Sequence, residues 1–303
     1  MASFFKRVQN RLSWQYLEIT DPLPFATRDL SWKVRWRMRN DRNPLFIVVQ
    51  DKYKGKEYAS ERGVRSADQY FVTDNPDTIP FDTLPDNCFI KANHGCKWNI
   101  YRKDGEFYYF GDGEELVGKN KFSDNRITRE QVVKYCKIWL SSTYSKREWA
   151  YGQIPPRIII EEVLEQRGGG ELIDYRFFTF HGVVKTVYID SATFSVHNQK
   201  IFVDRNWQEV LLKNLDEDVP HVVPEKPQNF EEMLSAAERL GSELDFARID
   251  LYDTTRGVTL GEISVYPMGG ASTQPTPDRE FNKWLADQWI LPDEKSLVSK
   301  SLA

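Results

Sequence analysis

The clearest pattern of hydrophobic and polar positions lies late in the chain, in FARIDLYDTTRGVTLGEISVYPMGG (residues 246–270). Hydrophobic and polar residues alternate on both sides of a short polar segment, 254–257, that ends in a glycine. This pattern predicts two β-strands joined by a hairpin loop. If the hairpin is symmetric about Arg256, one face is aliphatic and the other is polar. The aliphatic face consists of Ile249, Leu251, Ile263 and Val265, and the polar face of Arg248, Asp250, Glu262 and Ser264.

The predicted register places Asp250 directly opposite Glu262. Two carboxylates in this arrangement repel each other unless positive charge lies between them. Arg248 can neutralise part of that charge, and a divalent cation would neutralise more. Mg²⁺ favours sites with one or two carboxylates that leave positions for water and phosphate oxygens. A half-exposed hairpin with a cross-strand ion pair explains the same pattern, so both interpretations stay open.

The rest of the chain alternates short hydrophobic runs with helical periodicity, which indicates an α+β fold. Thr128 and Asn229 stand where helix caps are expected. Strands are predicted at 88–91, 99–102 and 157–160, a second hairpin at 174–180 and 183–189, and helices at 44–63, 128–139 and 229–241.

The segment RDLSWKVRWRMRNDR (residues 28–42) is locally basic and ambiguous. Its strict alternation predicts a strand with one cationic face, whereas the spacing of Trp32 and Trp36 fits a helix. The concentration of positive charge is typical either of a binding surface for a polyanion or of a solvated helix face.

Composition narrows the class of protein. The 303 residues are 40% hydrophobic and 28% charged, which is typical of a globular protein, and the net charge of −4 argues against a nucleic-acid binder. Three cysteines without C-x-x-C spacing argue against a disulfide framework or a zinc site and fit a reducing cytoplasm. The sequence contains no apolar run of about 18 residues, so it predicts no membrane-spanning segment. Near the N-terminus, Phe4, Phe5, Val8 and Leu12 have helical spacing, so this segment either docks on its own protein or associates peripherally with a membrane.

Several segments, in one order along the chain, resemble the TupA-like ATP-grasp family, which is named for teichuronopeptide synthesis. They are NPLF and DKYKGKEY (between 43 and 58), LPDNCFIKANHGCKWNI (84–100), IIIEEVLE (158–165), DYRFFTFHGVVK (174–185), ARIDLYD (247–253) and GEISVYPMGG (261–270). The resemblance spans about residues 30–292 and favours the helical interpretation of 28–42. It implies an ATP-grasp fold with two α+β lobes gripping a nucleotide. The expected parts are an N-terminal subdomain at 1–83, a small lobe at 84–156 and a large lobe at 157–303.

The resemblance also implies binding of ATP and Mg²⁺. Lys91 would reach the ATP phosphates, and the loop with Asn93, His94 and Gly95 would cover them. His94 is expected either to bond a phosphate or to serve as a structural hydrogen-bonding group. The adenine hinge would consist of Glu161, Glu162, Val163 and Leu164, and either Glu165 or Glu171 would hold the ribose.

The catalytic residues implied by the resemblance lie on the two hairpins. Arg176 would face the phosphates, and Arg248 would face the transferring phosphoryl group. Asp250 and Glu262 would hold Mg²⁺. Two positions depart from the usual pattern, because Ser264 stands where many ATP-grasp ligases have an asparagine ligand and Lys56 stands where an arginine is more usual.

The implied activity is that of an ATP-dependent carboxylate–amine ligase that acts through an acylphosphate. Its substrates would be an amine donor and a uronic-acid or peptide carboxylate of a cell-surface polysaccharide precursor. One alternative is a non-catalytic nucleotide-binding component of a polysaccharide-synthesis machine. A glycosidase that uses Asp250 and Glu262 as its acid pair is another.

Overall fold

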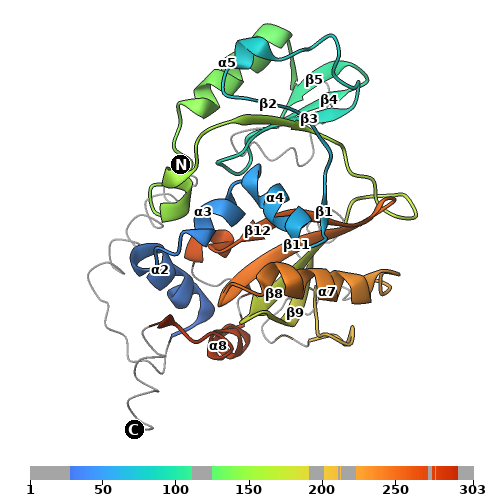
Figure 1. Cartoon of the computed structure of the whole chain (residues 1–303). Coiled ribbons are helices and arrows are strands. Elements are labelled where there is room, and N and C mark those ends of the chain that lie inside the picture. Colours follow the sequence, from blue (N-terminus) through green and yellow to red (C-terminus); the bar gives the residue numbers. More distant parts are fainter. Residues whose placement is uncertain are drawn as a thin grey trace, which may run out of the picture.

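The computed structural model describes residues 28–110, 125–190, 201–210, 212, 223–271, 275–276 and 278–292. Within these ranges the strands form two six-stranded sheets, each with its own hydrophobic core. The two sheets lie in different halves of the molecule in Figure 1, and we call these halves the large lobe and the small lobe. The α+β class predicted from the sequence is confirmed.

The large-lobe sheet is antiparallel except for the short edge strand β1, which runs parallel to β12. Its central strand β11 is almost completely buried. The order across this sheet is β1 (Arg65–Ser66), β12 (Gly257–Ser264), β11 (Phe246–Thr254), β8 (Asp174–Phe180), β9 (Val183–Asp190) and β10 (Ile201–Val203).

The small-lobe sheet is antiparallel throughout. Its strand β7 is the hydrophobic run IIIE, and it is buried along its whole length because it lies between two other strands. The order is β2 (Gln69–Thr73), β7 (Ile158–Glu161), β3 (Cys88–Ala92), β4 (Asn99–Lys103), β5 (Glu106–Tyr109) and β6 (Arg126–Ile127).

Helices cover both sheets (Figure 1). In the large lobe, α7 (Phe230–Gly241) packs on β8, β9 and β11, while α3 (Leu45–Gln50) and α4 (Lys54–Glu61) pack against β12. Helix α2 (Leu30–Asn40) contacts α8 (Arg279–Asp287) and the 3₁₀ turn η4 (Pro267–Gly270). In the small lobe, α5 (Arg129–Leu140) packs on β3 and on η2 (Pro76–Thr78). The 3₁₀ turn η3 (Trp149–Gln153) lies against α3, and its residues Trp149 and Ala150 belong to the large-lobe core.

The sheets divide the chain differently from the boundaries expected at 83/84 and 156/157. Strands β1 and β2 follow each other closely in sequence but belong to different sheets, and β7 pairs with β2 and β3 although it lies beyond residue 157. The chain therefore crosses between the lobes at 67–68 and again after Glu161. Antiparallel pairing of the aliphatic run of β7 with β3 decides this arrangement, and pairing partners are not visible in the sequence.

Of the two interpretations of 28–42, the helical one is confirmed and the strand is wrong, because this segment forms helix α2. Asp29 caps the helix by accepting a hydrogen bond from the Trp32 backbone amide at 2.8 Å. The expected cationic surface does not form either, since three of its basic side chains bind backbone carbonyls inside the large lobe. These pairs are Lys33 with Trp289, Arg35 with Gly270, and Arg37 with Phe246.

Thr128 forms a capping box with Gln131 at the start of α5, as expected of a helix cap. Asn229 precedes α7 but makes no capping bond, and its side-chain Nδ2 donates to Asp253 Oδ1 at 2.8 Å. The helix at 44–63 is divided into α3 and α4. The amphipathic N-terminal segment with Phe4 lies outside the described residues. No helix of the described chain is long and apolar enough to cross a membrane.

The β11–β12 hairpin has the predicted register at its charged end, where Asp250 pairs with Glu262 and Arg248 pairs with Ser264. Beyond Asp250 the register shifts by one residue, so that Leu251 pairs with Leu260 and Gly261 is the extra residue of a β-bulge. The symmetric hairpin assumed from the sequence is therefore correct at the acids and incorrect toward the loop.

Candidate active site

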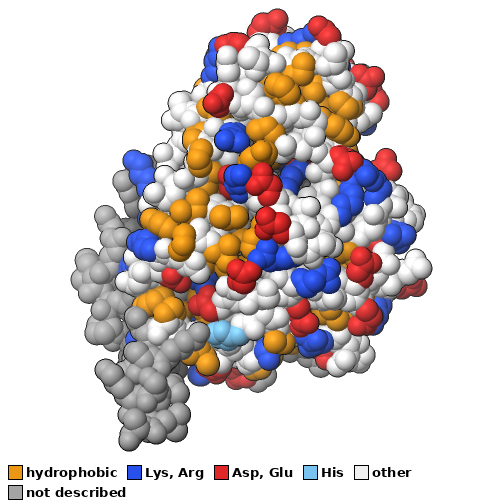
Figure 2. All heavy atoms as spheres, viewed as in Figure 1, with side chains coloured by type: hydrophobic (Ala, Val, Ile, Leu, Met, Phe, Trp, Pro, Cys, Tyr) orange, Lys and Arg blue, Asp and Glu red, His pale blue; other side chains and the backbone are white. Residues whose placement is uncertain are grey.

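A cavity of about 420 Å³ lies between the lobes and contains most of the predicted site residues. Figure 2 shows Lys, Arg, Asp and Glu side chains gathered across the middle of the molecule in this view. The predicted residues that line the cavity are Lys91, Glu161, Glu162, Leu164, Arg176, Asp250, Glu262 and Ser264. Asn93, His94, Gly95, Val163 and Arg248 are not among its lining residues.

Arg248 bridges the two predicted metal ligands. Its Nε and Nη2 donate to the two carboxylate oxygens of Asp250 at 2.7 and 2.5 Å, and Nη2 also donates to Glu262 Oε1 at 2.7 Å. Asp250 is 2% exposed, whereas the Glu262 side chain is 37% exposed and reaches toward the cavity. The cross-strand ion pair considered from the sequence is thus present, with Arg248 and Asp250 buried and Glu262 partly exposed.

Arg176 occupies the opposite side of Asp250, because β8 pairs with β11 so that these two residues face each other. Its guanidinium donates to Asp174 Oδ2 through Nε at 2.9 Å and pairs with Asp190 through Nη1 at 2.7 Å. Asp174 and Asp190 are direct cross-strand partners, so Arg176 offsets a repulsion between like charges. It lies 3.8 Å from Asp250 Oδ2.

Carboxylates outnumber guanidinium groups in this cluster. Burial, opposed by Arg248 and assisted by Asp174 and Glu262, raises the pKa of Asp250 to about 8. Burial would also raise the pKa of Glu262, but Lys52, Arg248 and Arg176 together lower it. The excess negative charge on one cavity wall favours a cation there.

Lys91 on β3 reaches the end of the neighbouring strand β7. Its Nζ pairs with Glu161 Oε1 at 2.6 Å, and Lys56 from α4 pairs with Glu161 Oε2 at 2.5 Å. Burial would raise the pKa of Glu161, but the two lysines outweigh it and hold this pKa at about 2. Glu161 therefore keeps two ammonium groups at the cavity wall, one from each lobe.

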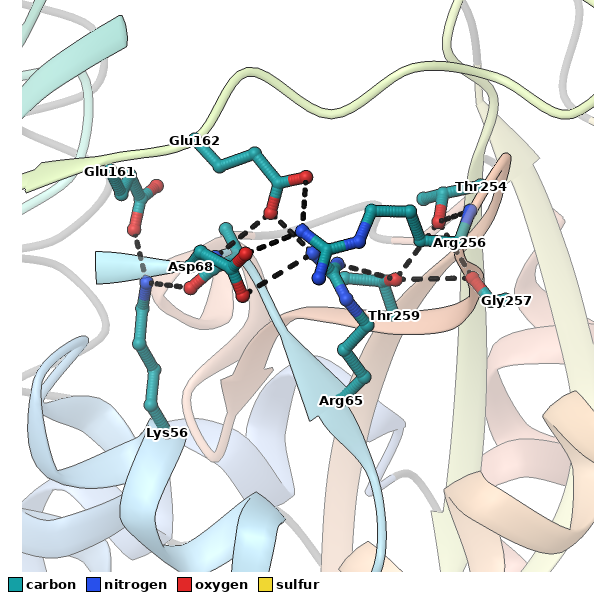
Figure 3. A network of polar contacts seen from close by, with 10 residues as sticks. Lys56, Arg65, Asp68, Glu161, Glu162, Thr254, Arg256, Gly257 and Thr259 are labelled. Carbon is teal, nitrogen blue, oxygen red and sulfur yellow. Dashed lines mark hydrogen bonds and ion pairs between the residues drawn. The ribbon is translucent and has the colours of Figure 1, made fainter. Parts of the chain in front are cut away.

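Glu162 belongs to a network that ties the lobe connections together (Figure 3). Arg65 and Arg256 of the large lobe both bind its carboxylate, and both pair with Asp68 on the other connection. The two connections also bond directly, since the Glu162 amide donates to the Asp68 carbonyl at 2.9 Å. The predicted hinge is thus a pair of adjacent connecting segments held by ionic contacts.

The predicted phosphate loop divides into a buried part and a cavity-facing part. The Asn93 side chain binds Asp51 Oδ1 and the Arg157 amide at 2.8 and 2.7 Å, and His94 lies between Asn93 Oδ1 and the Trp139 carbonyl. Burial lowers the pKa of His94, although hydrogen bonds with the backbone of Trp139 and Ser142 raise it. In this structure His94 has the structural role that was one of its two expected roles.

Gly95 is required by packing, because a Cβ at this position would lie 2.5 Å from the Trp98 ring. Its carbonyl accepts a hydrogen bond from Lys52 Nζ at 2.6 Å. The next residues, Cys96 and Lys97, line the cavity, and Lys97 has a positive φ of 62°. The loop therefore presents its second half to the cavity.

Tyr252 forms part of the cavity wall beside the acids. A Cβ at the bulge residue Gly261 would lie 2.5 Å from Tyr252 Cε2, so only glycine leaves room for this ring. Together with Phe89, Leu164, Leu172 and Leu260, the ring gives the cavity an aromatic and aliphatic part next to its charged part.

The donor set fits the expected ligands. Asp250 and Glu262 supply hard oxygen ligands from paired strands, and among the described residues no three His, Cys, Asp or Glu side chains form a larger metal cluster. Two carboxylates with open positions suit Mg²⁺, which is usually bound together with phosphate oxygens. The apolar part of the cavity suits a flat base, and Lys56 and Lys91 suit phosphates.

Sequence reasoning missed several residues of the cavity. Asp174 and Tyr252 carried a usable signal, because each lies two positions from a predicted site residue on the same strand face. Lys52 and Tyr151 carried none, since they lie on a turn and a short helix that only the tertiary fold brings to the cavity, whereas Cys96 belongs to the expected phosphate loop.

Solved structures with a similar arrangement are distant. D-alanine–D-alanine ligase from Bacillus anthracis, complexed with ATP, is 14% identical with a TM-score of 0.42, covering 84% of this chain and 67% of that one. The D-alanine–D-alanine ligase from Helicobacter pylori is 15% identical with a TM-score of 0.43, and the match covers 81% of this chain and 62% of that one. A RiPP-associated ATP-grasp ligase from Chryseobacterium gregarium, in complex with ADP and a leader and core peptide, is 13% identical with a TM-score of 0.39. This match covers 82% of this chain and 61% of that one.

The chain spans about two thirds or less of the length of these three proteins. No curated protein matches the sequence. The sequence does match the family model described as TupA-like ATPgrasp, over residues 32–290. This match covers most of the chain, including both sheets and every cavity residue. The protein therefore belongs to the TupA-like ATP-grasp family.

Proposed function

We propose that the protein is an ATP-dependent carboxylate–amine ligase that forms an amide through an acylphosphate. The observation that carries this proposal is the row Arg176, Asp250, Glu262 across three paired strands, facing Lys91 and Lys56 in one cavity. Phosphoryl transfer requires positioning and charge neutralisation more than covalent chemistry from the protein. This row supplies ligands for a metal ion and cations for phosphates in one place.

The residues divide into three roles. Asp250 and Glu262 would hold Mg²⁺, which would neutralise phosphate charge when bound. Lys91 and Lys56 would exchange Glu161 for phosphate oxygens, because both ammonium groups already lie at the cavity wall. Arg248 would turn from the acids to the transferring phosphoryl group, since a bound metal ion offsets the charge that Arg248 neutralises here.

The chemistry has two balanced steps. A carboxylate oxygen attacks the γ-phosphorus, forming a C–O–P bond while the bond to the β-phosphate oxygen breaks and ADP leaves. The amine nitrogen then attacks the acyl carbon, the C–O bond to phosphate breaks, and the nitrogen proton leaves with phosphate. Arg176 and Arg248 would hold the negative oxygens of the first step in line.

The polymer assignment rests on the family resemblance. A uronic-acid or peptide carboxylate of a cell-surface polysaccharide precursor is the acceptor that we propose, with an amino compound as donor. A non-catalytic nucleotide-binding role is the alternative, and the complete set of charged cavity residues favours the enzyme. A glycosidase would need no nucleotide, so thermal stabilisation of the protein by Mg-ATP would favour the ligase over a glycosidase.

The direct test is ADP release from protein, Mg-ATP and a panel of uronic acids and peptides combined with amino acids. We expect turnover with at least one pair, and no turnover by Asp250→Asn or Glu262→Gln. Asp77→Asn is the matched control, because Asp77 is an exposed acid paired with Lys137 far from the cavity. Tight ATP binding with no turnover for any pair would favour the non-catalytic alternative, and active Asp250→Asn would refute the metal site.

A further inference from the structure

One cation of the cavity, Lys97, differs from the others because its ammonium group is unpaired. Its side chain is exposed and lines the cavity together with Lys91 and Glu262. Within the described part of the chain, no carboxylate or carbonyl group binds its Nζ. By contrast, Lys56 and Lys91 share the carboxylate of Glu161. An anion in the cavity can therefore bind Lys97 without first breaking an ion pair.

Lys97 also has a backbone conformation that lysine rarely adopts. Its φ of 62° lies in the left-handed region, which glycine enters without strain and most other residues avoid. Strained conformations of this kind persist where the surrounding structure imposes them, and they are concentrated at functional sites. A lysine at a position that suits glycine indicates that its side chain has a role of its own.

The residues on both sides of Lys97 are held in place. The Gly95 carbonyl accepts a hydrogen bond from Lys52 Nζ at 2.6 Å, and the Trp98 carbonyl accepts one from the Ala92 amide at 3.3 Å. The Trp98 ring also fills the space where a Cβ of Gly95 would lie. The loop is thus fixed on both sides of a lysine that remains exposed.

The terminal phosphates of ATP are the anions that require this charge. Asp250 and Glu262 make one wall of the cavity negative, so phosphates there need cations besides the proposed metal ion. Lys97 lies on the loop between β3 and β4, directly after the strand that carries Lys91. We propose that the Lys97 side chain binds the β- and γ-phosphates of ATP. An ammonium group suits this role because it is a compact charge with three donors.

This inference rests on the proposed function and adds a phosphate-binding residue to the same site. The test measures the binding of adenylyl imidodiphosphate, a non-hydrolysable ATP analogue, and of AMP to the full chain with Mg²⁺, by calorimetry. Lys97→Gln should weaken binding of the analogue by at least about fivefold, because it removes a charge-assisted contact. Binding of AMP, which lacks both terminal phosphates, should not change.

Two further variants serve as controls for charge. Lys97→Arg keeps the positive charge and should retain most of the affinity for the analogue. Lys134→Gln removes the same charge from an exposed lysine of α5 and should bind the analogue like the unchanged protein. Circular dichroism verifies that each variant is folded.

Lys97→Gly separates the side chain from the backbone. Because glycine adopts this φ without strain, the variant should unfold at no lower a temperature than the unchanged protein. It should nevertheless lose as much affinity for the analogue as Lys97→Gln. Asp104→Gly changes another residue of positive φ, 50°, in the turn between β4 and β5, and should leave analogue binding unchanged because Asp104 does not line the cavity.

Unchanged analogue binding by Lys97→Gln would overturn the assignment, and so would an equal loss of affinity for AMP. A lower unfolding temperature of Lys97→Gly would also contradict it, because the lysine would then stabilise the loop. The two proposals fail in different ways. If the unchanged protein does not bind the analogue with Mg²⁺, the proposed function fails. Normal binding that is independent of Lys97 contradicts this inference alone.

Discussion

At the scale of single residues, the site depends on charges that are paired in a particular way. Glu161 holds Lys56 and Lys91, and Arg248 holds Asp250 and Glu262, so each of these charges already has a protein partner. Paired charges tolerate burial, whereas single ones do not. The charged residues of the site therefore also contribute to the stability of the folded protein.

Glu161 should make the protein sensitive to acid. Its pKa of about 2 lies below the value of about 4.3 expected in the unfolded chain, so its stabilisation is complete above the unfolded value and is lost as the pH falls toward 2. Between pH 7 and pH 3, we expect the free energy of unfolding to fall by roughly 2 kcal/mol less in Glu161→Gln than in the unchanged protein. Urea unfolding at pH 7, 4 and 3 measures the difference. Parallel pH profiles for the two proteins would show that Glu161 is not the group responsible.

Gly261 should be needed for the shape of the cavity. In Gly261→Ala the new methyl group meets the Tyr252 ring and the Asp250 carbonyl, so the ring must move, at a cost of about 1–3 kcal/mol. We expect lower stability and weaker stabilisation by Mg-ATP, measured as the thermal shift. Gly152→Ala serves as the control, because a Cβ there meets nothing within 4 Å. Equal shifts for the two variants would mean that the Tyr252 position is unimportant for ATP.

At the scale of elements, helix α2 supports the open end of the β11–β12 hairpin through hydrogen bonds. Arg37 is completely buried and donates to the carbonyls of Phe246 and Val265, which lie at the open end of the hairpin, at 2.7 and 3.1 Å. It also pairs with Asp245, and its guanidinium stacks on Trp289 at 4.2 Å. Segment 28–42, whose positive charge suggested a polyanion-binding surface, thus helps to support the strands of the candidate active site.

Arg37→Met should be strongly destabilising, because it leaves Asp245 and two buried carbonyls without their partner. We expect a loss of about 3–5 kcal/mol in the free energy of unfolding by urea. Lys54→Met removes an equal charge from an exposed i,i+3 pair and should cost less than about 0.5 kcal/mol. Similar losses in both variants would argue against a structural role for the buried arginine.

At the scale of the whole molecule, the cavity is made by both lobes and by the two connections between them. The small lobe contributes Phe89 and Lys91, and the large lobe contributes Asp250 and Glu262. Arg65 and Arg256 fasten the connections to the large-lobe sheet through Glu162 and Asp68 (Figure 3). A ligand that contacts both walls should therefore couple the two lobes.

Mg-ATP should stabilise both lobes together. At a concentration 100 times the dissociation constant, a ligand of the folded state adds about 2.7 kcal/mol to stability. We expect slower hydrogen exchange in β3 of the small lobe and in β11 of the large lobe when Mg-ATP is present. Asp250→Asn should remove the dependence on Mg²⁺. Protection confined to one lobe would contradict a site shared between them.

The sequence by itself determined the strands β3, β4, β7, β8, β9, β11 and β12, the α5 cap and the charged face of the late hairpin, because alternation and capping are local properties. It also carried the motifs that indicate the family. Only the tertiary structure decided that β7 joins the small-lobe sheet, that Arg248 bridges both acids, and that Arg37 is buried rather than exposed. It also brought Tyr151 and Lys52 to the cavity. These features depend on which segments pair and pack, and pairing between distant segments has no local signature in the chain.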